Sequence, residues 1–282
     1  MGFSSVMEIL QAIDDGKTWT GMWRRTAPSM AATTHMDCSY GGGGPPANYY
    51  ASAPFMWQTL SQYDGISHGP DAPGGEKFIH RIWALGALAA TGPLQLILCD
   101  YLAYCPFLDG DEIAEQTLPD YVLPRYADGA GVQVMLVIQG AGVSNAYVEM
   151  RYLNQDGLEC LTPLYLNSAA MANSAGSIAT SINASGNTYG IFMRLNLGDT
   201  GVRAVKGIRL NASTGAVFAV VLVKPICTIH TKDNSITPFE IDFLRTGFKM
   251  PKILNGAYLN FIGRSQLNAT PHNIAELNFV WP

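Results

Sequence analysis

Strand-like segments at short, regular intervals are the strongest constraint on the fold of this 282-residue sequence. After residue 131 they recur roughly every 8–12 residues, separated by turns rich in Gly, Asn and Ser. No strand–helix alternation supports a parallel α/β fold. The sequence therefore predicts an all-β chain of the β-sandwich or jelly-roll type. The expected strands are Val132–Ile138, Ala146–Leu153, Cys160–Tyr165, Gly190–Leu195, Gly201–Leu210, Ala216–Val223, Cys227–Thr231, Ala257–Phe261 and Glu276–Trp281.

The first half of the sequence is also expected to be β-rich. Thr18–Arg24 alternates between apolar and polar residues, as a half-buried strand does. Lys77–Ala90 and Leu94–Ala103 are expected to form a strand pair joined by a turn at Thr91-Gly92-Pro93. Helix is the competing prediction for Trp83–Ala90, because Ala and Leu are good helix formers. The flanking glycines favour the strand.

The stretch from Ile97 to Ile138 indicates a passage between two β-rich parts. An apolar strand breaks at Pro106, an acidic loop and two more prolines follow, and a second apolar strand then begins. The acidic start of Asp109–Thr117 is compatible with one helical turn. The expected organisation is a helical arm at residues 1–16, a first β-rich domain at 17–108, a connector at 109–125 and a second β-sandwich domain at 126–282.

One short helix is predicted at the N-terminus. Val6, Ile9, Leu10 and Ile13 recur at three- and four-residue spacing, which predicts a helix over Phe3–Ile13 that ends at Asp14-Asp15-Gly16. Its apolar face either packs on its own domain or docks on a neighbouring subunit. Both possibilities remain open from the sequence.

Composition argues against several classes of partner. Charged residues make up only 14% of the chain, against about a quarter in typical proteins, and the net charge of −5 comes with no basic stripe. We therefore expect no nucleic-acid partner. No apolar run reaches the roughly 18 residues that a membrane helix needs, so no membrane partner is expected. A surface with few charges suits a subunit that buries much of itself against neighbours.

Catalytic and metal-binding patterns are weak in this sequence. The five histidines are scattered, and no G-x-S-x-G elbow is present. Five cysteines at spacings that match no zinc or redox motif are expected to be reduced thiols. Asp109, Asp111 and Glu112 are compatible with Ca²⁺ binding, but solvated loop acids are the favoured interpretation. We expect a non-enzymatic protein with no catalytic, cofactor or metal residues; a hydrolase is the poorly supported alternative.

Aromatic residues give the better binding hypothesis. Several lie in a segment rich in Gly and Pro, where they are able either to stack on sugars or to form subunit interfaces, and the low charge favours interfaces. The C-terminal residues are apolar to the end, which predicts that they are tucked into a sheet or an interface. The candidate interface residues are Val6, Ile9, Leu10, Ile13, Tyr49, Tyr50, Phe55, Trp57, Phe279 and Trp281.

Seven segments spread along the sequence carry a further signal. They are Ile97–Tyr101, Tyr104–Asp109, Leu123–Val132, Tyr152–Gly157, Gly201–Ile208, Val220–Pro225 and Asn255–Ile262. Together they resemble a family of tailed-bacteriophage virion structural proteins. Their order and spacing agree with that family from about Gly16 to the C-terminus, and none of them is a catalytic motif.

The resemblance implies a component of the virion, assembled in the host cytoplasm. It implies a head decoration (cement) protein that stabilises the capsid lattice, with the major capsid protein and further copies of itself, as a homotrimer, for partners. A place in the tail or baseplate, or a host-glycan-binding role, is the alternative.

Overall fold

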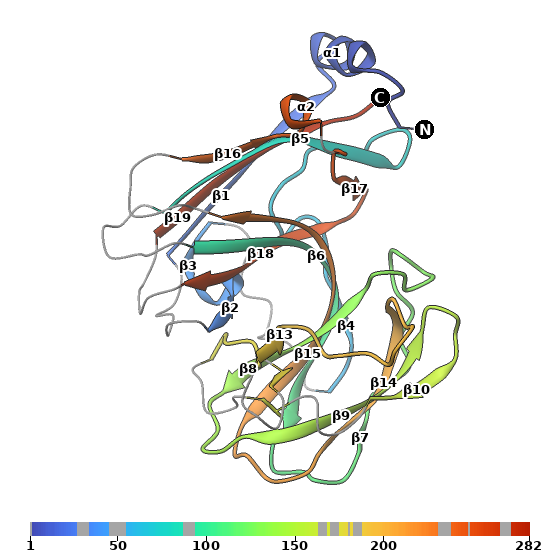
Figure 1. Cartoon of the computed structure of the whole chain (residues 1–282), viewed down its shortest axis with the longest axis vertical. Helices are drawn as coiled ribbons and strands as arrows, with labels where there is room; N and C mark the ends of the chain where they lie inside the picture. The colour runs from blue at the N-terminus through green and yellow to red at the C-terminus, as the bar shows by residue number, and fades with distance from the viewer. Residues whose placement is uncertain are drawn as a thin grey trace.

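The computed structural model describes residues 2–26, 34–44, 55–86, 94–162, 168–169, 175–179, 181–182, 188–230, 238–247, 249–265 and 272–282. Antiparallel strands dominate this part of the chain, and the all-β prediction is confirmed (Figure 1). The helical elements are α1 (Val6–Asp14), the 3-10 helix η1 (Cys38–Tyr40) and α2 (Phe243–Thr246).

One sheet combines strands from both ends of the chain, and we call it the terminal sheet. Its order is β16 (Phe239–Asp242), β5 (Glu76–Gly86), β19 (His272–Val280), β1 (Thr18–Thr26) and β3 (Gly42–Gly43), and β17 (Lys252–Leu254) also pairs with β5.

A second sheet, which we call the central sheet, packs against the terminal sheet. Its order is β2 (His35–Asp37), β18 (Tyr258–Ser265), β6 (Leu94–Asp109), β15 (Val217–His230) and β8 (Gln133–Gly140), and β4 (Gln58–Thr59) also pairs with β6.

The third sheet, the distal sheet, forms the other end of the molecule in Figure 1. Its order is β10 (Glu159–Leu161), β9 (Ala146–Asn154), β14 (Val202–Leu210) and β7 (Gln116–Thr117), and β11 (Ser168–Ala169) also pairs with β9. A separate pair consists of β12 (Ser181–Ile182) and β13 (Thr188–Gly190).

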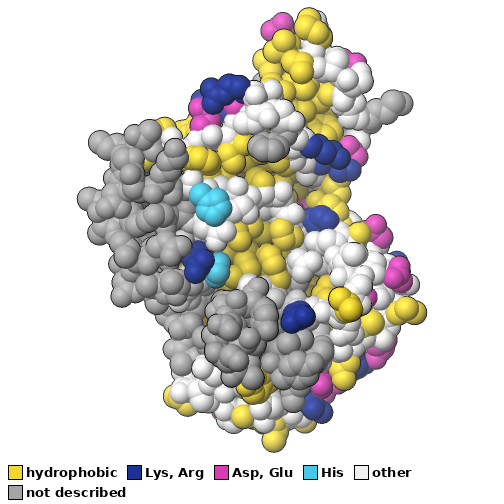
Figure 2. Space-filling model, in the orientation of Figure 1, with side chains coloured by type: hydrophobic (Ala, Val, Ile, Leu, Met, Phe, Trp, Pro, Cys, Tyr) yellow, Lys and Arg dark blue, Asp and Glu magenta, His cyan; other side chains and the backbone are white. Residues whose placement is uncertain are grey.

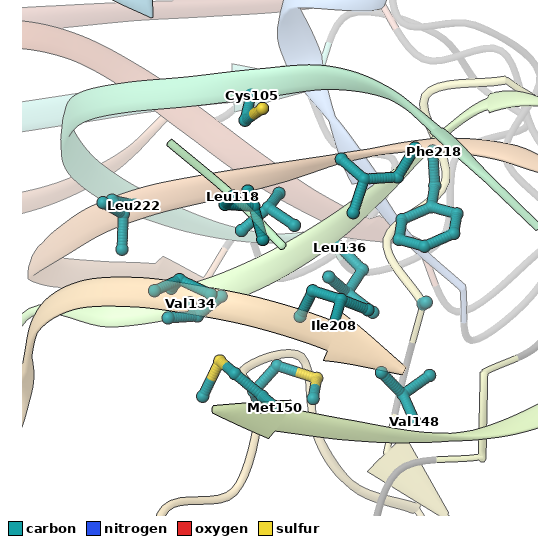
Figure 3. Close-up of a cluster of buried hydrophobic side chains, with 14 of the residues drawn as sticks. Cys105, Leu118, Val134, Leu136, Val148, Met150, Ile208, Phe218 and Leu222 are labelled. Atoms are coloured by element: carbon teal, nitrogen blue, oxygen red, sulfur yellow. The ribbon is translucent and has the colours of Figure 1, made fainter. Parts of the chain in front are cut away.

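The central sheet is shared between two sandwiches. Along β6, Leu96 and Leu98 belong to a core that includes residues of the terminal sheet, whereas Leu102 belongs to a core with the distal sheet. Because alternate residues of a strand share a face, the terminal and distal sheets cover two ends of the same face of the central sheet. Figure 3 shows the second of these cores, in which Leu222 and Leu136 of the central sheet lie opposite Met150 of the distal sheet.

The opposite face of the central sheet is covered as well. Tyr101, Val221 and Tyr258 lie in a third buried cluster, together with Leu60 and Ile178 from outside the long strands. The long central strands therefore bury side chains on both faces, which explains their nearly continuous apolar sequence.

Strand β9 follows the sequence prediction closely. Val148, Met150 and Tyr152 are buried, and the residues between them are partly exposed. Strands β9 and β10 form an antiparallel hairpin across Asn154–Gly157.

Pro106 does not end a strand, and the prediction of a break there is wrong. Strand β6 runs from Leu94 to Asp109. Its partner β15 pairs Val220 with Cys105 and Phe218 with Leu108, so that Pro106 and Phe107 form a bulge, with Phe107 at φ 61°. A proline in a bulge needs no ladder hydrogen bond, and the bulge bends the strand.

The predicted pairing of Lys77–Ala90 with Leu94–Ala103 is also wrong, because β5 and β6 belong to different sheets. Ile79 and Ile82 of β5 lie in the same core as Leu96 and Leu98 of β6, so these strands are stacked face to face. Their hydrogen-bonding partners are other strands: β5 pairs with β19, and β6 with β15 and β18.

Three smaller predictions also need correction. Asp109–Thr117, whose acidic start was compatible with one helical turn, forms turns and β7. Ala216–Val223 and Cys227–Thr231 belong largely to the single strand β15. The predicted strand Gly190–Leu195 is mostly irregular, because β13 ends at Gly190.

Sheet membership does not follow the expected division of the chain into residues 17–108 and 126–282. Strands β1 and β5 of the first part pair with β19 of the second, and β6 pairs with β15 and β18. Within residues 109–125, Leu118 and Leu123 are buried in the core of the distal sandwich. The connector is therefore part of the packed structure.

Candidate interaction surface and pocket

Helix α1 begins at a capped end, close to the predicted Phe3–Ile13. The backbone N–H of Glu8 donates to Ser5 Oγ at 3.3 Å, and the Glu8 carboxylate accepts from the backbone N–H of Ser4 at 2.7 Å. The bond to Ser5 satisfies an amide group that the first turn leaves without a helical partner. The hydroxyl of Ser4, which also donates to the Glu8 carboxylate, and the backbone N–H of Ser4 hold the pKa of Glu8 below its usual value. The helix start is thus well defined.

One face of α1 packs against the terminal sheet, and another face is exposed to solvent. Ile9 and Ala12 are buried against Phe78 and Val280 of the terminal sheet. By contrast, Val6, Met7 and Leu10 are 56%, 72% and 45% exposed, and we call these three the α1 apolar face. Figure 2 shows hydrophobic side chains over the protruding end of the molecule where α1 lies. The four predicted helix residues therefore differ in burial: Ile9 is buried, Ile13 is half-buried, and Val6 and Leu10 face solvent.

The four predicted loop aromatics have different surroundings. Tyr49 and Tyr50 lie outside the described residues. Phe55 and Trp57 are partly buried against the core of the distal sandwich. Trp57 Nε1 donates to the carbonyl oxygen of Pro119 at 2.9 Å, and its ring stacks on Tyr121 with 5.3 Å between ring centres. Their interface role stays a prediction, because these contacts are within the chain.

The C-terminal residues are held in the terminal sheet. Phe279 and Val280 are fully buried. Trp281 donates its backbone N–H to the carbonyl oxygen of Lys17 at 3.2 Å, and Lys77 Nζ lies 5.5 Å from the centre of the Trp281 ring. The apolar end of the sequence is thus explained by packing inside the chain.

The carboxylates of Asp109 and Asp111 accept hydrogen bonds from the acidic loop itself and from the loop that contains Ser213 and Gly215. Asp111 accepts from the N–H of Gly215 at 2.7 Å and from the hydroxyl of Ser213, and these bonds lower the pKa of Asp111. Asp109 accepts from the N–H of Asp111 at 2.9 Å. In the part of the chain that the structure describes, no three His, Cys, Asp or Glu side chains are grouped as a metal site requires.

All five cysteines are free thiols. Burial raises the pKa of Cys105 and Cys227 to about 12. Since the thiolate is the reactive form, these two side chains are unreactive near neutral pH.

A pocket that the sequence did not predict lies between the start of β1 and the loop of residues 61–75. It has a volume of about 370 Å³, and its lining includes Trp19, Gln62, Tyr63, Ser67 and Asp71. Trp19 is 42% exposed and Tyr63 is 87% exposed. The sequence indicated only a turn cluster at Gly65–Gly75, and Trp19 is too distant from it in sequence to be connected with it.

The buried side chain of Lys77 forms hydrogen bonds with this loop. Lys77 Nζ donates to the carbonyl oxygens of His68 and Gly69 at 2.7 and 3.0 Å and lies 2.9 Å from His68 Nδ1. His68 Nε2 lies 3.0 Å from the carbonyl oxygen of Ala257. Burial, with the nearby Lys77, lowers the pKa of His68 to about 4, and burial lowers that of Lys77 to about 8. A neutral imidazole that accepts from the lysine fits these contacts.

A second concavity of about 570 Å³ lies near the junction of the sandwiches, lined in part by Tyr126, Lys224, Phe243 and Lys252. Three lysines contribute to its lining. Lys224 Nζ donates to the carbonyl oxygen of Ala130 at 2.6 Å, Lys252 Nζ lies 3.0 Å from Glu76 Oε1, and Lys249 is exposed.

Among the described residues, no helix has the length and apolar character needed to cross a membrane. No protein-family model and no curated protein matches the chain.

Solved structures give only distant likenesses. The structure of infectious bursal disease virus Gt strain has a TM-score of 0.17 at 9% identity, over 94% of this chain and 80% of that chain. The infectious bursal disease virus VP2 subviral particle has a TM-score of 0.16 at 7% identity, over the same shares of the two chains. TM-scores this low carry no argument about fold or function.

Proposed function

We propose that this chain is a non-enzymatic structural protein of a tailed-bacteriophage virion, and specifically a head decoration protein that binds the major capsid protein lattice. The resemblance of its sequence segments to that family is one support. The structural observation that carries the proposal is the α1 apolar face, formed by Val6, Met7 and Leu10.

The α1 apolar face has the properties of a docking element. Ile9 and Ala12 fix the helix on the sheet, so binding a partner would cost little ordering of the helix. Three neighbouring apolar side chains left open at a protruding end are typical of an interaction surface. Burying what they expose contributes on the order of 1 kcal/mol each.

A modest contribution per copy suits a protein that acts in many copies. Binding to the assembled lattice, and not to loose subunits, stabilises the assembled state by mass action. The low content of charged residues, 14%, fits a subunit with large contact areas. We propose that the protein also contacts itself, as a homotrimer around a threefold axis of the lattice.

The test uses particles assembled without this protein, to which purified full-length chain is added. The variant Val6→Ser/Met7→Ser/Leu10→Ser is expected to bind particles at least about tenfold more weakly than the native protein. The matched control is Val122→Ser/Val143→Ser, which alters two side chains that are 84% and 89% exposed elsewhere. Equal binding by the two variants would contradict the role of α1.

A further inference from the structure

We propose that the pocket beside Trp19 and Tyr63 binds a neutral saccharide. This inference concerns a different surface from the α1 apolar face and goes beyond the decoration role.

The aromatic residues provide the first part of the argument. Sugar rings present a face of C–H groups that packs against aromatic rings. Trp19 and Tyr63 line one pocket and are 42% and 87% exposed, so both offer aromatic surface to a ligand. Aromatic side chains bring a large contact area at little cost in conformational entropy.

Trp19 is held in place by its surroundings. Its ring lies against Gly69: a Cβ at that position would come 2.7 Å from Trp19 Cγ, and Gly69 has φ +80°. Only glycine fits both the conformation and the contact. The ring is therefore oriented before any ligand arrives.

Polar groups surround the aromatic pair. Gln62, Ser67 and Asp71 line the pocket with an amide, a hydroxyl and a carboxylate. Together these groups donate and accept hydrogen bonds, which is what the vicinal hydroxyls of a sugar require.

The loop that carries these groups is anchored along its length. The N–H of Ile66 donates to the carbonyl oxygen of Leu259 at 2.9 Å. The side chain of Asn255 makes two hydrogen bonds with the backbone of Ala72, at 2.9 and 3.1 Å. The N–H of Gly256 donates to Gln62 Oε1 at 3.2 Å. With the bonds from Lys77, these contacts make a preformed site.

The charges decide the class of sugar. Asp71 lines the pocket, whereas the ammonium group of Lys77 is buried and its donors are directed to His68 and Gly69. Since Asp71 lies in the loop that lines the pocket and the described lining residues include no Lys or Arg, acidic sugars are disfavoured. The ligand is therefore neutral.

The experiment is saturation-transfer NMR with the purified full-length protein. The probes are the methyl glycosides of glucose, galactose, N-acetylglucosamine and rhamnose, each up to about 10 mM, with N-acetylneuraminic acid as the acidic comparison. At least one neutral probe is expected to bind. Tyr63→Ala is expected to raise its Kd about fivefold and Trp19→Ala about tenfold.

The control variant is Tyr147→Ala, which removes a partly exposed tyrosine from β9 in the distal sheet and should leave the Kd unchanged. Tyr63 is so exposed that its loss should not affect folding, which keeps the test valid if Trp19→Ala is unstable. The proposal is overturned if no neutral probe binds, if both pocket variants bind like the native protein, or if N-acetylneuraminic acid is preferred. Particle binding through α1 is measured separately, so the two proposals fail independently.

Discussion

Arg125 and Asp100 form a buried ion pair at the junction of the two sandwiches. Arg125 Nη2 donates to Asp100 Oδ1 at 2.7 Å and Nε donates to Oδ2 at 2.8 Å. Asp100 lies on β6 between Leu98 of one core and Leu102 of the other, and it also accepts from the backbone N–H of Tyr258 at 3.0 Å. The pair ties the end of the connector to the shared sheet.

Removal of Arg125 should be strongly destabilising. Arg125→Met leaves the fully buried Asp100 carboxylate without its cation, and we expect a loss of about 3–5 kcal/mol in the free energy of unfolding, measured by urea titration at pH 8. Burial already raises the pKa of Asp100, and Arg125 opposes that effect. Without Arg125 the folded state takes up a proton more readily than the unfolded state, so the loss should be smaller at pH 5.

Arg81→Met is the matched control for that variant. Arg81 pairs with Glu240 at 2.6 Å, but both side chains are well exposed. We expect a loss below about 1 kcal/mol in the free energy of unfolding. Equal losses in the two variants would show that the buried pair has no special role.

The folded state should lose stability in mild acid. Burial, with the charge of Lys77, lowers the pKa of His68 from 6.5 to about 4, and burial, with Arg264, lowers that of His35 to about 4. Between pH 4 and pH 6.5 the unfolded state binds more protons than the folded state, so the free energy of unfolding falls as pH decreases from 6.5 to 4. His68→Gln should make this fall shallower by on the order of 2 kcal/mol, and a His68→Gln variant with the same pH dependence as the native protein would contradict this account.

Gly21 is expected to tolerate no side chain. A Cβ there would lie 2.3 Å from the carbonyl oxygen of Ser67, in the loop that forms the saccharide pocket. Gly21→Ala should therefore lower the free energy of unfolding by about 1–3 kcal/mol and loosen this loop, seen as faster amide hydrogen exchange. Gly74→Ala meets open space and should change stability by less than about 0.5 kcal/mol. An unaffected Gly21→Ala variant would refute the close packing of β1 on the loop.

The C-terminal residues should be required for folding. Deleting Asn278–Pro282 removes the fully buried Phe279 and Val280 and the last pairs of β19 with β1 and β5. We expect the shortened protein to be insoluble or, where it stays in solution, to lack the native β-sheet signal in circular dichroism. Deleting the exposed Pro282 alone should leave the melting temperature unchanged. A soluble, folded protein lacking residues 278–282 would contradict this expectation.

Local patterns in the sequence predicted local structure well. The strand predicted at Ala146–Leu153 coincides with β9, and the spacing of Ile9 and Ile13 located α1. Such patterns follow from the 2- and 3.6-residue periods of strands and helices.

Contacts between distant segments were not predictable in the same way. No local signal shows that β5 stacks on β6, or that β6 pairs with β15 across a bulge at Pro106. The pocket depends on Trp19 packing against Gly69, which are far apart in sequence, and on Lys77, whose burial nothing in the sequence indicates. These features arise only when the sheets come together.

The copy number of this protein relative to the major capsid protein in purified particles tests the proposed role most directly. A head decoration protein is expected in many copies, in a simple ratio to the lattice subunit, when the particle proteins are quantified by mass spectrometry. A few copies per particle would place it in the tail or baseplate instead. Its absence from purified particles would contradict a structural role in the virion.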